Sequence, residues 1–132
     1  MRTVVLDAYA LMVFLEDEAG ADRVRELILQ AEQSELQLMM SIVNLGEVWY
    51  SIARATTPET AESYVQQMRG MAIEFLDANW EMTRQAAAFK AIGGISYADC
   101  FAAATARLNQ AELVTGDKEF LVLEKDIQIN WL

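Results

Sequence analysis

Short apolar runs alternate with longer amphipathic stretches along this chain, and that alternation constrains its fold more than any other feature. Thr3–Leu6 is a continuous, β-branched run of the kind that forms a strand buried on both faces. Ala8–Leu15 and Ala21–Gln33 follow as predicted helices, the second with apolar residues at helical spacing. Strands that alternate with helices predict an α/β fold, a parallel-sheet α/β/α sandwich covered on both faces.

The same alternation continues to the end of the chain. Further strands are expected at Leu36–Met40, Ile73–Leu76, Leu113–Val114 and Ile127–Ile129. Further helical segments are expected at Ile42–Ala55, Thr57–Arg69, Trp80–Ile92, Ser96–Asn109 and Lys118–Leu123. We find no linker or internal repeat, so residues 1–132 are expected to form a single domain. In parallel sheets ligands bind beyond the carboxyl ends of the strands, where the strand order reverses.

Composition excludes several classes of protein. A hydrophobic fraction of 54% excludes a disordered chain. No apolar run reaches the ~18 residues that a membrane span needs. The N-terminal stretch makes a poor signal peptide because Asp7 interrupts it, and the expected compartment is the cytoplasm.

The chain has no histidine and one cysteine, Cys100. This excludes Ser-His-Asp and Cys-His catalysis, the zinc deaminases and most zinc hydrolases. Cys100 lies in an uncharged, alanine-rich stretch and is expected to be a buried helix residue, not a nucleophile. The chemistry must therefore use carboxylates, hydroxyls, amines or a bound ion.

The net charge of −10 argues against a protein that binds nucleic acid through a broad basic face. It does not exclude an enzyme that reaches phosphate through metal ions, and it suits a basic protein partner.

Two carboxylates follow predicted strands directly. Asp7 comes after Thr3–Leu6, where it could also cap the next helix. Asp117 comes shortly after Leu113–Val114, in a turn where Asp is common for structural reasons.

Two more carboxylates lie on predicted helices. Glu47 shares one face of a largely apolar helix with Asn44 and Ser51, a polar stripe that could simply face solvent. Asp99 stands three residues after Ser96, as in a capping box, and the segment that follows it, Cys100–Ala106, carries no charge.

Taken together, the four acids predict a metal site. Carboxylates within ~4 Å of one another repel by ~4 kcal/mol per pair at an effective dielectric constant of 20. A fold rarely keeps several such pairs unless protons or cations neutralise them. Oxygen ligands without histidine or cysteine select Mg²⁺ or Mn²⁺, and such ions support hydrolysis of phosphodiesters.

The chain resembles the PIN domain family, and more closely the VapC-type toxins of toxin–antitoxin pairs. The matching segments occur in the family's order: residues 4–11 (VVLDAYAL), 44–48 (NLGEV), 96–106 (SYADCFAAATA) and 113–120 (LVTGDKEF).

The resemblance implies an endoribonuclease that depends on Mg²⁺ or Mn²⁺. It implies that the acidic positions, catalytic and metal-binding, are Asp7, Glu47, Asp99 and Asp117. Asp7 and Asp99 would be the direct ligands, and the other two would bind metal directly or through water. Thr115 matches the family's hydroxyl position, and Glu119 could share the role of Asp117. The resemblance also implies a homodimer and a small antitoxin with a basic tail.

Other acidic phosphoryl-transfer designs fit less well. A haloacid-dehalogenase-type phosphatase needs a second Asp where this chain has Tyr9, and a response-regulator receiver needs an acidic neighbour for Asp7. A catalytically silent PIN-fold module that only binds a partner or RNA remains an alternative.

Other side chains are interpreted structurally. Lys118, Arg54 and Lys90 could touch RNA phosphates but are expected to be solvated surface charges. The remaining set is expected to make core or dimer contacts: Trp49, Tyr50, Met12, Phe14, Met39 and Met40.

Overall fold

Five parallel strands form the central sheet in the computed structural model, which describes residues 1–132. They are β1 (Arg2–Leu6), β2 (Leu36–Ser41), β3 (Glu74–Leu76), β4 (Glu112–Thr115) and β5 (Gln128–Trp131). Their order across the sheet is β3-β2-β1-β4-β5, and every neighbouring pair is parallel. The predicted parallel α/β sandwich of one domain is thereby confirmed.

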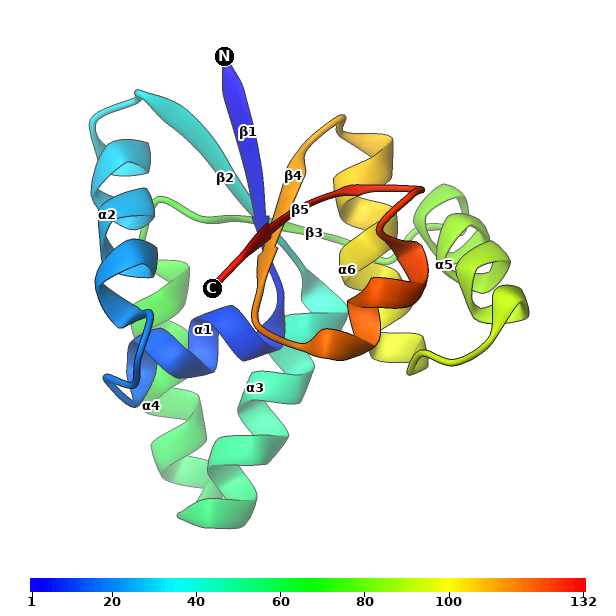
Figure 1. The fold of residues 1–132 in the computed structure, drawn as a ribbon. Helices are drawn as coiled ribbons and strands as arrows, with labels where there is room; N and C mark the ends of the chain where they lie inside the picture. Colours follow the sequence, from blue (N-terminus) through cyan, green and yellow to red (C-terminus); the bar gives the residue numbers. More distant parts are fainter.

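Helices cover both faces of this sheet (Figure 1). They are α1 (Ala8–Leu15), α2 (Ala21–Glu32), α3 (Ile42–Ala55), α4 (Pro58–Arg69), α5 (Trp80–Ile92), α6 (Tyr97–Leu108) and the 3₁₀ helix η1 (Lys118–Leu123). None of them combines the length and apolar character that a membrane crossing requires.

The core consists of two apolar clusters, one on each face of the sheet. Val4 and Leu6 of β1 pack into the cluster under α1 to α4, whereas Val5 packs into the cluster under α5, α6 and η1. Successive residues of a strand point to opposite faces, so a continuous apolar run is what a doubly covered strand requires. Cys100 lies fully buried in the second cluster, as expected.

The predicted elements are all present, and their ends differ from the expected ones by at most two residues. The predicted helix starts at Thr57 and Ser96 prove to be N-caps, so α4 and α6 begin one residue later.

Of the side chains expected to make core or dimer contacts, five pack in or against the core and one does not. Met39 and Met40 are buried, and Met12, Phe14 and Trp49 are partly buried against the first cluster. Tyr50 is 46% exposed and belongs to neither core cluster, so of the two expected roles only the dimer contact stays a prediction.

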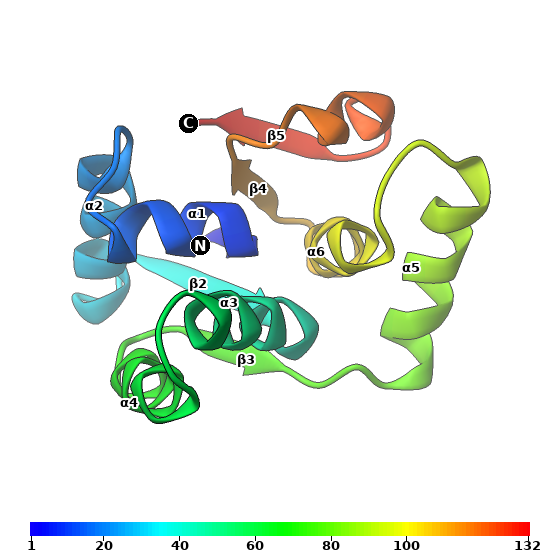
Figure 2. The same ribbon diagram turned by 90° about the horizontal axis from the view of Figure 1, so that it is seen from below.

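The strand order reverses between β1 and β4, so the chain leaves these two neighbours in opposite directions. This is the place where parallel sheets open a crevice for ligands. The amino-terminal ends of α1, α3 and α6 lie around it, as Figure 2 shows from below.

Candidate metal centre

Asp7 stands at the carboxyl end of β1 and is 1% exposed. One carboxylate oxygen, Oδ1, accepts a hydrogen bond of 2.8 Å from the amide of Ala10, which makes Asp7 the N-cap of α1. The other oxygen, Oδ2, accepts one of 2.5 Å from the hydroxyl of Thr115. The capping role expected for Asp7 is present, and Thr115 holds the carboxylate from the neighbouring strand.

The turn after β4 continues this network. The Thr115 hydroxyl also accepts a hydrogen bond of 3.0 Å from the amide of Asp117. The Asp117 carboxylate in turn accepts one of 3.0 Å from the amide of Glu119, which makes Asp117 the N-cap of η1. One hydroxyl therefore connects the acids that follow β1 and β4.

Asp99 meets this turn from α6. Carboxylate oxygens of Asp99, Asp117 and Glu119 lie within 4.8 Å of one another, a spacing at which one ion could bind all three. Ser96 caps the helix by accepting a hydrogen bond of 3.2 Å from the amide of Asp99. Asp99 is 8% exposed, while Glu119 is exposed.

Glu47 is connected to the same region through Asn44. The side-chain nitrogen Nδ2 of Asn44 donates a hydrogen bond of 2.8 Å to Oε1 of Glu47 and one of 3.0 Å to the carbonyl oxygen of Ala98. Asn44 is fully buried, so the polar stripe on α3 does not face solvent at this position. Asn44 therefore connects Glu47 to the first turn of α6, where Ala98 directly precedes Asp99.

The electrostatics show that these acids share one environment. Burial raises the pKa of Asp7 to about 7, against the hydrogen bond from Thr115, and the charges of Asp117 and Glu47 raise it further. Burial and the charge of Asp117 raise the pKa of Asp99 to about 8, although the Ser96 hydroxyl opposes this shift. Burial also raises the pKa of Glu47.

No cationic side chain neutralises the cluster. The four ion pairs of the molecule join Arg2 to Glu112, Arg25 to Asp17 and Asp22, and Arg107 to Asp126. None includes a carboxylate of the crevice. The amino-terminal ends of α1 and α6 offer only partial positive charge to Asp7 and Asp99.

The donor set fits a hard divalent cation. It consists of carboxylate oxygens from separate segments, without sulfur or imidazole. The Oδ1 atom of Asn44 is buried without a hydrogen-bond partner and adds one more uncompensated oxygen beside Glu47. Asp7, Glu47, Asp99, Asp117 and Glu119 are the residues that could hold such an ion.

The structure thus brings the four acids predicted from sequence to one edge of the sheet, with Glu119 beside Asp117. Their catalytic and metal-binding roles stay a prediction. Sequence reasoning missed the role of Asn44, although its position three residues before Glu47 on the same helix face was the available signal.

The basic residues considered for RNA lie on the surface. Arg54 is exposed and stacks over the ring of Tyr50, 5.1 Å from its centroid. Lys90 donates a hydrogen bond of 2.8 Å to the carbonyl oxygen of Ile95, and Lys118 is exposed.

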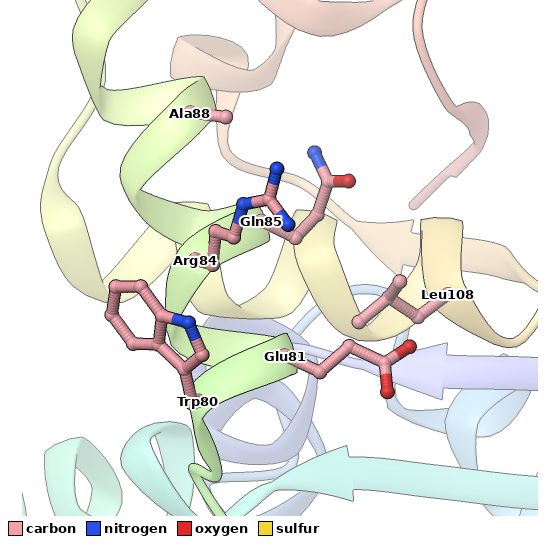
Figure 3. Close-up of a pocket in the computed structure, with 6 residues that line it drawn as sticks. All are labelled: Trp80, Glu81, Arg84, Gln85, Ala88 and Leu108. Carbon is pink, nitrogen blue, oxygen red and sulfur yellow. The ribbon is translucent and has the colours of Figure 1, made fainter.

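A separate hollow of about 420 Å³ lies between α5 and the far end of α6 (Figure 3). Trp80, Arg84 and Gln85 line it from α5, and Leu108 lines it from α6. Leu108 stands nine residues after Asp99, about 14 Å along the helix axis, so this hollow does not belong to the carboxylate crevice.

Comparison with known proteins identifies relatives at the level of family and fold. The model of the PIN domain family matches residues 4–126. Among curated proteins nothing matches.

Several solved structures share the fold over nearly the whole chain. One is the structure of VapBC2 from Rickettsia felis bound to a DNA fragment from the promoter. It matches with a TM-score of 0.76 and 16% identity, covering 98% of both chains. DNA-bound VapBC from Salmonella typhimurium matches with a TM-score of 0.74 and 20% identity, covering 99% of this chain and 98% of the other. VapC20 of Mycobacterium tuberculosis, a sarcin–ricin loop cleaving toxin, matches with a TM-score of 0.68 and 16% identity, covering 90% and 93%.

Proposed function

This chain belongs to the PIN domain family, and we propose that it is a metal-dependent endoribonuclease that acts as the toxin of a type II toxin–antitoxin pair. The observation that carries the proposal is the cluster of buried carboxylates at the strand-order reversal, which no lysine or arginine neutralises. The likeness to VapC20, a toxin that cleaves the sarcin–ricin loop, supports it.

We assign the metal, Mg²⁺ or Mn²⁺, to Asp7 and Asp99 as direct ligands. Glu47 and Asp117 complete the site directly or through water. A bound divalent cation would polarise a phosphate oxygen and lower the pKa of a water molecule.

The protein's own groups orient these acids. Thr115 donates to Asp7, and Asn44 donates to Glu47, so each carboxylate keeps one orientation before an ion or RNA arrives. Glu47 lines a hollow of about 310 Å³ together with Tyr9 and Ser51, where it can accept a hydrogen bond from the attacking water.

The experiment that tests this function is cleavage of RNA by the purified chain with and without metal. We expect cleavage with Mg²⁺ or Mn²⁺ and none in excess chelator. We also expect Mn²⁺ to raise the melting temperature, because a ligand that binds only the folded state stabilises it by mass action. Full cleavage in chelator would contradict the proposal. Intact partner binding without cleavage would identify the silent binding module instead.

The proposed partner is a small antitoxin whose basic tail reaches the carboxylates, and the proposed assembly is a homodimer in the cytoplasm. The similarity to chains of VapBC structures supports an antitoxin partner. The net charge of −10 suits a basic tail. Such a complex should bind more weakly at high salt, which a titration at two ionic strengths measures, while light scattering measures the oligomeric state.

A further inference from the structure

Tyr9 lies against Gly116, which sits between Thr115 and Asp117 in the turn after β4. A Cβ atom built on Gly116 would lie 2.8 Å from Cζ of Tyr9 and 3.0 Å from its hydroxyl oxygen, and closer still to Cε1. Atoms at such distances overlap, so the ring occupies the space that any other residue at position 116 would need.

Space, and not backbone conformation, is the reason for this glycine. Three glycines of the chain have positive φ angles, Gly20, Gly93 and Gly94, and Gly116 is not among them. An alanine could therefore adopt the backbone of Gly116 without strain. What it could not do is share the site with the ring of Tyr9.

The turn that the ring contacts carries two groups of the carboxylate crevice. The hydroxyl of Thr115 donates to Asp7, and the carboxylate of Asp117 lies beside that of Asp99. Both flank Gly116 directly in sequence. A displacement of the turn would move both groups away from the acids that they face.

The ring spans two elements that meet at the crevice. Tyr9 is in the first turn of α1, two residues after Asp7, and its ring reaches the turn between β4 and η1. Tyr9 also lines the hollow beside Glu47, and 47% of it is exposed. An exposed tyrosine adds little to the core, so its contact with Gly116 points to another role.

We propose that Tyr9 is a positioning residue of the metal centre, whose ring packs on Gly116 and holds the Thr115–Gly116–Asp117 turn against Asp7. This inference rests on the proposed function, because it assumes that these acids bind a divalent ion. This positioning role needs the aromatic ring of Tyr9 but not its phenolic hydroxyl.

The test is a Mn²⁺ titration by calorimetry on the full chain after removal of metal, with four variants: Tyr9→Phe, Tyr9→Ala, Gly116→Ala and the double variant Tyr9→Ala/Gly116→Ala. Residues that orient metal ligands typically contribute about 10-fold or more to metal affinity. We expect Tyr9→Phe to bind like the wild type. We expect Tyr9→Ala and Gly116→Ala each to bind about 10-fold more weakly. The double variant should be no weaker than the weaker single variant, because both changes remove the same contact.

Gly46→Ala is the matched control, because a Cβ atom at this exposed position of α3 meets nothing within 4 Å. It should leave the Mn²⁺ affinity unchanged. A thermal melt in chelator shows whether each variant folds. If Gly116→Ala does not fold, the difference in Mn²⁺ affinity between Tyr9→Ala and Tyr9→Phe decides the proposal. Wild-type affinity in Tyr9→Ala, or losses that add in the double variant, would overturn the proposal.

RNA cleavage by the same proteins separates this inference from the function itself. If the wild type binds Mn²⁺ but cleaves no RNA, the proposed function fails and the affinities still decide the role of Tyr9. If the wild type binds no Mn²⁺, both fail.

Discussion

At the scale of single residues, Asp7 combines an observed structural role with a proposed functional one. Asp7 caps α1 through Oδ1 and receives the Thr115 hydroxyl at Oδ2, yet its pKa is raised to about 7 by burial. A neutral residue with the same shape could do the capping without the cost of a buried charge. Helix capping alone does not require a buried charge here, which fits the proposed role of Asp7 in binding a cation.

We predict that Asp99→Asn abolishes Mn²⁺ binding and RNA cleavage and at the same time stabilises the metal-free protein. The amide keeps the shape of the carboxylate but carries no charge, so folding no longer has to bury a charge at this position or place it beside Asp117. Titration with Mn²⁺, an RNA cleavage assay and urea unfolding in chelator measure the three effects. Asp77→Asn, the same substitution at an exposed position, should change none of them. Cleavage at the wild-type rate by Asp99→Asn would refute the assignment.

We predict that Asn44→Ala destabilises the protein by about 1–3 kcal/mol, because it removes the two hydrogen bonds that the buried side chain donates to Glu47 and to the carbonyl oxygen of Ala98. It should also weaken Mn²⁺ binding about 10-fold, since Glu47 loses its orienting donor. Ser51→Ala, one turn beyond Glu47 on the same face of α3, is the control. Equal behaviour of the two variants in urea unfolding would show that Asn44 has no special role.

At the scale of elements, the crevice depends on how helices begin. The four helices that begin near the crevice all have a Ser or Asp N-cap: α1 at Asp7, α3 at Ser41, α6 at Ser96 and η1 at Asp117. These starts were readable in the sequence because capping is local. For Tyr50 the sequence left a core contact and a dimer contact open, because periodicity alone does not say which face of a helix the rest of the chain covers. Its exposure excludes the core contact, and the dimer contact stays a prediction.

We predict that Ser96→Ala and Thr57→Ala destabilise the protein similarly, by about 1 kcal/mol each, but differ at the metal centre. The Ser96 hydroxyl accepts a hydrogen bond of 3.2 Å from the backbone amide of Asp99, and the Thr57 hydroxyl accepts one of 3.1 Å from the backbone amide of Thr60. Of these two helices only α6 carries a proposed metal ligand, Asp99, in its first turn, so only Ser96→Ala should weaken Mn²⁺ binding. Equal Mn²⁺ affinities of the two variants in calorimetry would show that the cap does not position Asp99.

At the scale of the whole molecule, negative charge is concentrated where no cation of the chain can balance it. The net charge is −10, and the ion pairs lie outside the crevice. The fold therefore stores electrostatic free energy that a divalent ion or a basic partner can release.

We predict that the metal-free protein loses stability as the pH rises from about 4 to about 8. The pKa of Asp7 rises from 3.8 to about 7 on folding, and that of Asp99 from 3.8 to about 8. A carboxyl with a raised pKa binds its proton more tightly in the folded state. Its stabilising effect is complete below pH 3.8 and lost as the pH passes the folded pKa.

For Asp7 the shift corresponds to at most about 4 kcal/mol. Urea unfolding in chelator at several pH values measures the effect, and Asp99→Asn should reduce the slope. Mn²⁺ should reverse the trend, because it replaces the protons. A metal-free stability that rises steadily between pH 5 and pH 8 would contradict this prediction.

The helices and strands of this protein, and the set of acids at its crevice, could be predicted from the amino-acid sequence. Apolar runs, helical spacing and capping residues act over a few positions, so they can be read along the chain. The exit of Asp7 and Asp117 from parallel strands follows from that reading, since all such strands point the same way.

Which side chains contact one another across the crevice could not be predicted in this way. Thr115 bonds to Asp7 across 108 positions, Asn44 reaches Ala98 across 54, and Tyr9 covers Gly116 from another element. These contacts depend on the order of strands in the sheet and on how helices pack across it. No local pattern specifies that order, because it results from the packing of the whole core at once.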